Sequence, residues 1–190
     1  METTTREERW TSTQWLLRLQ ILSLLLRELC CCKHQAAWQS MDQIQFHAVC
    51  VLFDNQSQRL YVSSSVSSRL NLKSVSSENL CINTFGDTIC RKQRCDAVKL
   101  CLRIRNHQEL ELCVVNFPVI CLPLPSRVNV ADFVYLKGLE LADDFDNTES
   151  INVLIGSNYY WDFVSGDSIK GDQAPTAVYN KFGWLLSGPM

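Results

Sequence analysis

The sequence lacks an excess of charge of either sign. Its 18 Lys and Arg residues and 20 Asp and Glu residues give a formal net charge of -2 over 190 residues. Proteins that bind nucleic acids carry a basic patch and a high pI, whereas the pI of this chain is about 5.9. We therefore expect the scattered charges to form a solvated surface, with no nucleic-acid partner.

Long apolar runs are missing as well. The leucine-rich stretch over residues 15–32 contains Arg18 and Arg27, so it falls short of the ~20 apolar residues that a membrane span needs. No small-residue cleavage site of a signal peptide follows it. Leucines at helical spacing instead predict a helix, and we expect residues 1–43 to form a helical extension outside the core, with no membrane partner. These leucines are Leu16, Leu19, Leu22, Leu26 and Leu29.

The ten cysteines lack the spacing of a disulfide framework or of a zinc site. Three are adjacent, at 30–32, and others alternate within strand-like runs, as small buried side chains do in a reducing compartment. Adjacent cysteines cannot easily surround one tetrahedral ion, and no second pair lies at a zinc-finger spacing. We expect a cytoplasmic protein with no metal and no cofactor.

Two catalytic signatures are absent too. The chain contains no Gly-x-Ser-x-Gly motif and no P-loop, so nothing indicates an α/β-hydrolase or a P-loop nucleotide-binding protein. From residue 44 onward the pattern is that of strands, and alternating apolar and polar residues over 98–105 and 109–114 predict a half-buried hairpin. The sequence therefore predicts a mainly β domain over residues 44–190, with a short helix over 159–163.

One acidic residue ends an apolar strand. Residues 49–53 run directly into Asp54, Asn55, Gln56 and Ser57. Burial raises the pKa of a carboxyl group, and a second carboxylate beside it raises the pKa further. Asp54 is therefore a candidate catalytic acid, although aspartate is also common as an ordinary turn residue.

Four strings of residues are unusual enough to suggest a family. They are 51–59 (VLFDNQSQR), 139–143 (LELAD), 153–161 (VLIGSNYYW) and 181–189 (KFGWLLSGP). The order of elements, with an acid turn, a Gly-tipped hairpin, an amphipathic hairpin and a Leu-Ile-Gly strand, resembles that of retroviral aspartic proteases. The closer resemblance is to the protease-like domain of BEL/Pao-type LTR retrotransposon polyproteins.

This resemblance implies a retropepsin-like closed β-barrel and an aspartic endopeptidase that processes a polyprotein. The chain holds one such acid turn, so an active form would be a homodimer with a polypeptide substrate, in which two copies of the turn meet. The residues that the resemblance implicates are Asp54 as the catalytic acid, Asn55, Gln56 and Ser57 in the acid turn, Phe85 and Gly86 in a flap, and Leu154, Ile155 and Gly156 in the strand beneath the turn.

Two residues depart from the family pattern. Gln56 stands where the family has Gly, and Asn158 stands where it usually has Asp. Hydrolysis by two carboxyls that share a proton requires two turns to approach closely. Glycine suits this approach because it has no Cβ and tolerates a positive φ, whereas Gln56 would strain the turn or occupy the place of the attacking water. The alternative function is therefore a non-catalytic protein-interaction module or a decayed retroelement fragment.

Overall fold

The described chain is mainly β-strand, as the sequence predicted. The computed structural model describes residues 30–39, 44–82, 91–121, 133–142, 150–171 and 175–188. The elements are β1 (Cys30–Gln39), β2 (Ile44–Phe53), β3 (Tyr61–Ser63), α2 (Ser64–Arg69), β4 (Ser74–Ile82), β5 (Arg91–Arg103), β6 (Glu109–Phe117), a 3-10 helix (Val134–Leu136), β7 (Val153–Ile155), α3 (Ser157–Phe163), β8 (Val164–Lys170), β9 (Thr176–Asn180) and β10 (Gly183–Ser187).

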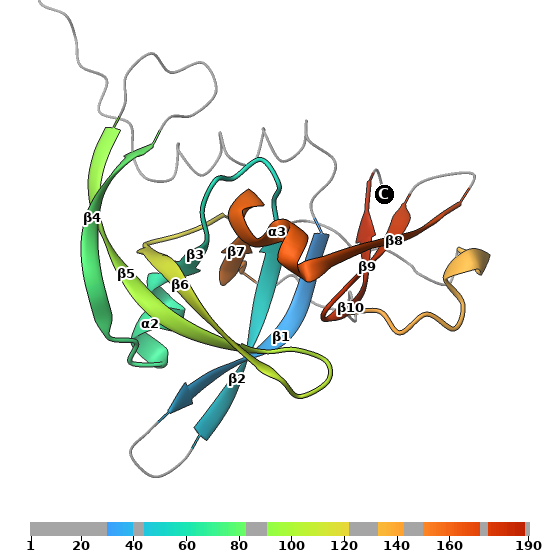
Figure 1. Ribbon diagram of the computed structural model, residues 1–190, viewed down its shortest axis with the longest axis horizontal. Coiled ribbons are helices and arrows are strands. Elements are labelled where there is room, and N and C mark those ends of the chain that lie inside the picture. Colours follow the sequence, from blue (N-terminus) through green and yellow to red (C-terminus); the bar gives the residue numbers. More distant parts are fainter. Residues whose placement is uncertain are drawn as a thin grey trace, which may run out of the picture.

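The strands form two sheets (Figure 1). Seven strands follow one another in the order β1-β2-β7-β3-β6-β5-β4, with an additional pairing between β1 and β5, and the second sheet has the order β10-β9-β8. Within the larger sheet, β7 pairs in parallel with β2 and antiparallel with β3. It therefore lies between the two strands that flank the acid turn.

An aromatic cluster connects the acid-turn strand to the rest of the fold. Phe53, the last residue of β2, is fully buried. Its ring makes edge contacts with the rings of Tyr160, Phe163 and Phe182, at centroid distances of 6.1, 5.9 and 6.0 Å. Such contacts stabilise a core beyond the area that they bury. Because the partners come from α3 and from the turn between β9 and β10, this cluster joins the two sheets beneath the acid turn.

The predicted amphipathic hairpin is confirmed. β5 and β6 are antiparallel, and Leu100 pairs with Leu112 while Lys99 pairs with Cys113. Both leucines are buried, whereas Lys99 and Cys113 are exposed. The period of two in the sequence thus places one apolar face on the core. The preceding hairpin, β4–β5, is antiparallel as well, and its expected flap residues Phe85 and Gly86 lie outside the described residues.

The expected helical extension is wrong for residues 30–39. These residues form strand β1, which pairs with β2 over ten residue pairs and with β5 over three. Pairing with strands far along the chain satisfies the backbone groups that a helix would have satisfied locally, so tertiary contacts override the local pattern. The leucine stripe itself lies outside the described residues. No helix in the described segments is long and apolar enough to cross a membrane.

Two cysteines depart from the expected absence of disulfides. Cys50 and Cys81 are disulfide-bonded, while Cys95, Cys101, Cys113 and Cys121 are free. Disulfide formation depends on the distance between Cα atoms in the fold. The spacing of cysteines along the chain does not give this distance, so the sequence did not predict these disulfides.

The free cysteines provide a test of the fold. Burial raises the pKa of the Cys121 thiol to about 11, so at pH 8 only about 0.1% of it is the reactive thiolate. Cys113 is exposed on β6. We expect iodoacetamide at pH 8 to alkylate Cys113 well before Cys121, as followed by peptide mass spectrometry. Both should react equally in urea, and faster reaction of Cys121 in the native chain would contradict the fold.

Residues from two of the four unusual strings lie side by side at one edge of the smaller sheet. Leu141 forms a parallel bridge with Trp184. The Ala142 N–H donates to the carbonyl of Trp184 over 2.9 Å, and the Trp184 N–H donates to the carbonyl of Glu140 over 3.1 Å. This segment therefore covers the β10 edge of the three-stranded sheet.

Candidate functional site

The acid turn begins where β2 ends. The Asp54 N–H donates to the carbonyl of Ile155 on β7 over 3.0 Å. Its side-chain Oδ1 accepts a hydrogen bond of 2.9 Å from the Gln56 N–H, which is the geometry of an Asx turn. The Ser57 N–H donates to the Asp54 carbonyl over 3.3 Å. The half-buried carboxylate of Asp54 is thus held in place by the backbone of its own turn.

Gly156 lies directly beneath this turn. The following residue, Ser157, donates its N–H to the carbonyl of Ser57 over 2.7 Å. A Cβ at position 156 would lie 2.3 Å from the carbonyl oxygen of Arg59 and 2.7 Å from that of Ser57. Only glycine fits so close a backbone approach. The structure therefore brings Ile155 and Gly156 against the acid turn, with Leu154 one residue earlier in the same buried strand.

The side chains of Asn55 and Gln56 are exposed at the tip of the turn. The Gln56 Nε2 donates to Asn55 Oδ1 over 3.1 Å. Among the described non-glycine residues, Asn71 and His107 have a positive φ and Gln56 does not. The expected backbone strain at Gln56 is therefore absent, and its carboxamide projects from the turn instead.

Asn158 follows Ser157, the residue that is hydrogen-bonded to the acid turn. It is exposed in the first turn of α3, after Ser157. None of the described residues form a group of three or more His, Cys, Asp and Glu side chains that could hold a metal ion. The side chains of residues 54–57 supply one carboxylate, two carboxamides and one hydroxyl group.

An ion pair beside the acid turn was missed in the sequence. Arg59 Nη1 donates to Glu78 Oε1 on β4 over 2.9 Å. Next to this pair, burial raises the pKa of the Tyr61 hydroxyl, against the opposing effect of Arg59. Burial also raises the pKa of the Cys95 thiol, and Glu78 adds to that effect. The pair joins the acid-turn segment to β4 of the β4–β5 hairpin. A local sequence pattern does not predict such a contact, because the two residues are far apart in the chain.

The contribution of this ion pair should be small and sensitive to salt. The side chains of Arg59 and Glu78 are 50% and 33% exposed, and exposed pairs contribute about 0.5 kcal/mol. We expect a double-mutant cycle with Arg59→Ala and Glu78→Ala, measured by urea unfolding, to give a coupling of this size that disappears in high salt. A coupling above about 2 kcal/mol would contradict an exposed pair.

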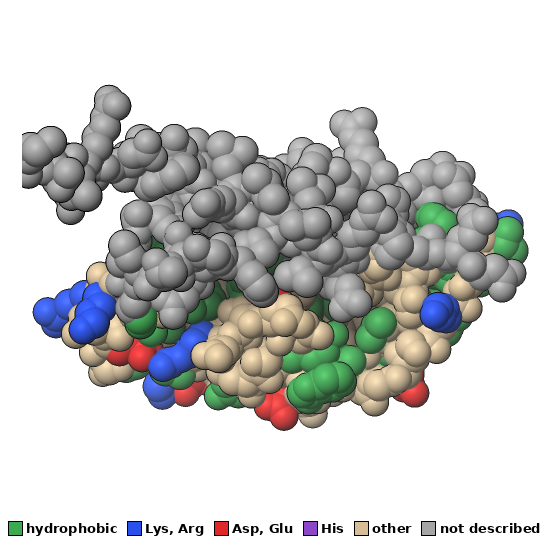
Figure 2. Space-filling model, turned by 90° about the horizontal axis from the view of Figure 1, so that it is seen from above, with side chains coloured by type: hydrophobic (Ala, Val, Ile, Leu, Met, Phe, Trp, Pro, Cys, Tyr) green, Lys and Arg blue, Asp and Glu red, His purple; other side chains and the backbone are tan. Residues whose placement is uncertain are grey.

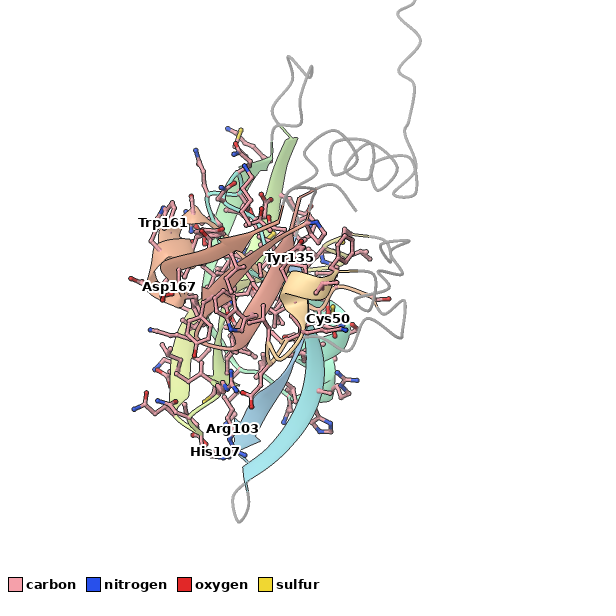
Figure 3. The ribbon with its side chains drawn as sticks, turned by 90° about the vertical axis from the view of Figure 1, so that its right-hand side faces the viewer. Cys50, Arg103, His107, Tyr135, Trp161 and Asp167 are labelled. Atoms are coloured by element: carbon pink, nitrogen blue, oxygen red, sulfur yellow. The ribbon has the colours of Figure 1, made fainter. Side chains whose placement is uncertain are left out.

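A cavity lies apart from the acid turn. It has a volume of about 550 Å³ and is lined by residues of the β5–β6 turn, the end of α3 and the β9–β10 turn. None of its lining residues is one of the predicted site residues. Figure 3 shows His107, which lies in the β5–β6 turn, at the end of the molecule far from Trp161 on α3. The cavity and the acid turn thus share no residue.

Large exposed apolar side chains come from separate elements. They are Val75, Val119, Val134 and Trp161, and Trp161 is 70% exposed beside the ring of Tyr160. Figure 2 shows small groups of hydrophobic side chains among polar atoms on the described part of one face. Single exposed apolar residues are normal on a soluble surface, so the polar features are the more informative ones here.

Comparison with known proteins gives one family. A family model with the description "Putative peptidase (DUF1758)" matches residues 42–189. No curated protein and no solved structure matches the chain. The matched segment includes the acid turn, the strand β7 beneath it and the cavity.

Proposed function

Because the chain belongs to the DUF1758 family, we propose that it is an aspartic endopeptidase in which Asp54 is the catalytic acid. The observation that carries this proposal is the placement of the acid turn. Asp54 directly follows the buried end of β2, its carboxylate accepts a hydrogen bond from the Gln56 N–H, and its turn lies on Gly156. Such preorganisation is what a catalytic carboxyl requires.

The chemistry requires a second carboxyl group. Peptide hydrolysis by this route needs a base to activate water and an acid to protonate the leaving nitrogen. Two carboxyls that share one proton supply both, because like charges about 3 Å apart cannot both ionise. The sequence holds one such turn, so the proposed active form is a symmetric homodimer in which Asp54 faces its twin.

Within the aspartic endopeptidases, the proposed family is that of retropepsin-like proteases of the BEL/Pao retrotransposon type. Its support is the sequence resemblance, together with the position of β7 between β2 and β3 and the pairing of β1 with both β2 and β5. A closed barrel would bring these strands together around one core. The proposed substrate is a polypeptide, in the family's role a polyprotein. The cytoplasmic location expected from the cysteines loses its basis, because Cys50 and Cys81 are disulfide-bonded and disulfides are rare in a reducing compartment.

A second candidate function is a non-catalytic interaction module. Gln56 favours it, because an exposed carboxamide projects from the turn where the family has glycine. In the proposed dimer, the two copies of this side chain would stand close to the place of the attacking water. The fold would then persist as a binding scaffold without cleavage.

The experiment that separates these functions is cleavage of a mixture of unrelated peptides by the purified chain, followed by mass spectrometry over a series of pH values and protein concentrations. We expect a bell-shaped pH profile with a mildly acidic optimum, because one proton must be shared by the pair. The rate per subunit should rise with protein concentration as the dimer forms. The peptidase proposal fails if no peptide is cut at any concentration, or if cleavage is independent of pH across the acidic range.

A further inference from the structure

The cavity between the two sheets has a preformed frame. The Arg105 N–H donates to the carbonyl of Lys181 over 3.1 Å, and the Lys181 N–H donates to the carbonyl of Phe163 over 3.0 Å. These bonds connect the β5–β6 turn, the β9–β10 turn and the end of α3. The Phe163 ring is itself buried and stacks on Phe182 at 5.3 Å. The walls of the cavity are therefore held in place by backbone hydrogen bonds and by the aromatic core.

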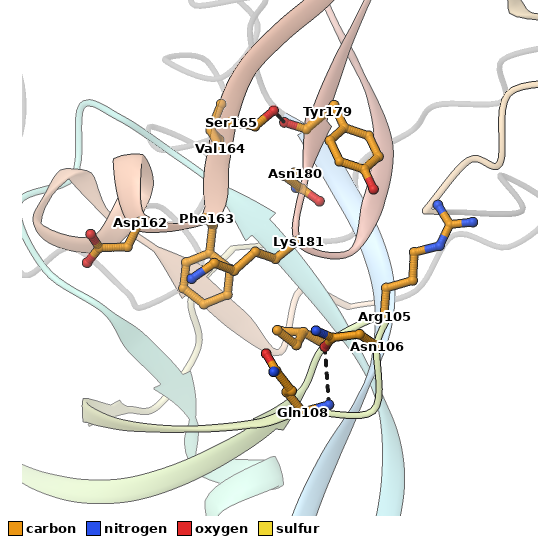
Figure 4. Close-up of a pocket in the computed structure, with 11 residues that line it drawn as sticks. Arg105, Asn106, Gln108, Asp162, Phe163, Val164, Ser165, Tyr179, Asn180 and Lys181 are labelled. Carbon is orange, nitrogen blue, oxygen red and sulfur yellow. Dashed lines mark hydrogen bonds between the residues drawn. The ribbon is translucent and has the colours of Figure 1, made fainter.

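Hydrogen-bonding side chains surround this space (Figure 4). Lys181 lies near its centre, with its Nζ 5.6 Å from the centroid of the Phe163 ring. The carboxamides of Asn106 and Gln108 lie on the β5–β6 turn below it, and both side chains are exposed. Asn106 Oδ1 accepts a hydrogen bond of 3.2 Å from the Gln108 N–H, which fixes the orientation of the Asn106 amide. Donors thus face the cavity from two sides.

The charges of the lining favour an acidic ligand. Arg105 and Lys181 are basic and Asp162 is the one acidic residue among the lining residues. In Figure 4, Asp162 lies at the opposite end of the cavity from Arg105, with Lys181 between them. Arg105 also pairs with Glu140, which lies outside the lining. The Lys181 ammonium has no such acidic partner among the described residues and rests on an aromatic face.

We propose that this cavity binds an acidic peptide segment. A Glu or Asp side chain would pair with Lys181, and the carboxamides of Asn106 and Gln108 would bind the peptide groups of the ligand. Carboxamides offer both donors and an acceptor and so match a main chain, whereas a phosphate would leave the Gln108 oxygen unused. The volume of about 550 Å³ is that of pockets that hold ligands larger than a single ion.

The proposal is independent of the proposed peptidase activity. The cavity shares no residue with the acid turn, so it would serve equally as a second contact for a substrate or as the binding site of a non-catalytic module. The Arg105–Glu140 pair adds a prediction of its own. Glu140 competes with an acidic ligand for Arg105, so removing its charge should strengthen binding.

The test uses fluorescence anisotropy of labelled peptides with the full chain carrying Asp54→Asn, a substitution that is expected to prevent cleavage. Three peptides share one Gly-Ser background and carry several Glu, Gln or Lys residues. We expect the Glu peptide to bind more tightly than the Gln peptide and the Lys peptide to bind least. Lys181→Gln should weaken binding of the Glu peptide about threefold, and Glu140→Gln should strengthen it by a similar factor.

The matched control is Lys73→Gln, which removes the same charge from an exposed lysine outside the cavity. It should leave the affinity for the Glu peptide nearly unchanged. The proposal is overturned if Lys73→Gln weakens binding as much as Lys181→Gln does, if the Glu and Gln peptides bind equally, or if no peptide binds. Circular dichroism of each variant excludes unfolding as the cause. Cleavage by the chain with its native Asp54 decides the peptidase proposal separately.

Discussion

Replacing Asp54 by asparagine is expected to abolish peptide cleavage and to leave the fold intact. The side chains have the same shape, and an asparagine Oδ1 accepts a hydrogen bond as the carboxylate does. The 2.9 Å bond from the Gln56 N–H can therefore persist, together with the turn. The amide cannot take or give the shared proton, so the cleavage rate should fall at least about a hundredfold. Peptide cleavage and thermal unfolding, measured on the same preparations, test both halves of this prediction.

Gln56→Gly is the matched variant for this experiment. Gln56 has no positive φ, so glycine is not needed there for the backbone. The substitution removes an exposed carboxamide and its hydrogen bond to Asn55. Cleavage by the native chain that disappears in Asp54→Asn would establish a peptidase that tolerates Gln56. Cleavage in Gln56→Gly alone would identify an intact scaffold blocked by one side chain, and would favour the interaction module. Equal cleavage by Asp54→Asn and the native chain would exclude Asp54 from catalysis.

The sequence predicted the elements whose signal is local. The alternation around Leu100 and Leu112 identified the β5–β6 hairpin, and the apolar runs ending at Phe53 and Ile155 identified β2 and β7. A short helix was expected over 159–163, and α3 covers Ser157–Phe163. In each case the period of the side chains or the composition of a few neighbouring residues carried the information.

Local sequence patterns did not predict which distant segments pair with one another. The sequence of residues 30–39 does not indicate that they pair with β2 and β5. The leucines at helical spacing before them favoured a helix instead. The contact of Arg59 with Glu78 depends on such long-range pairing, and the spacing of the cysteines did not predict that Cys50 and Cys81 are disulfide-bonded. Even the role of Gly156 was only implied by resemblance, because its need for glycine arises from two carbonyl groups about a hundred residues earlier in the chain.

The second large effect is expected for Gly156→Ala, which should destabilise the whole domain. The new Cβ would lie 2.3 Å from the Arg59 carbonyl oxygen and 2.8 Å from the Arg59 nitrogen, and these are backbone atoms that cannot rotate away. Either β7 or the acid turn must shift, and overpacking of this kind costs about 2–3 kcal/mol. Urea unfolding should show this loss. Because the shift displaces the turn that carries Asp54, cleavage should fall as well.

Gly138→Ala provides the control for this prediction. Gly138 has a φ of +84°, and a Cβ there would meet nothing within 4 Å, so its substitution costs backbone strain of about 1 kcal/mol without a clash. Gly156 has a φ of -87°, which alanine adopts readily, so its cost would come from the clash alone. A smaller loss for Gly156→Ala than for Gly138→Ala would mean that the acid turn does not rest on β7 as described. The peptidase proposal would then lose the support that positions its catalytic carboxyl.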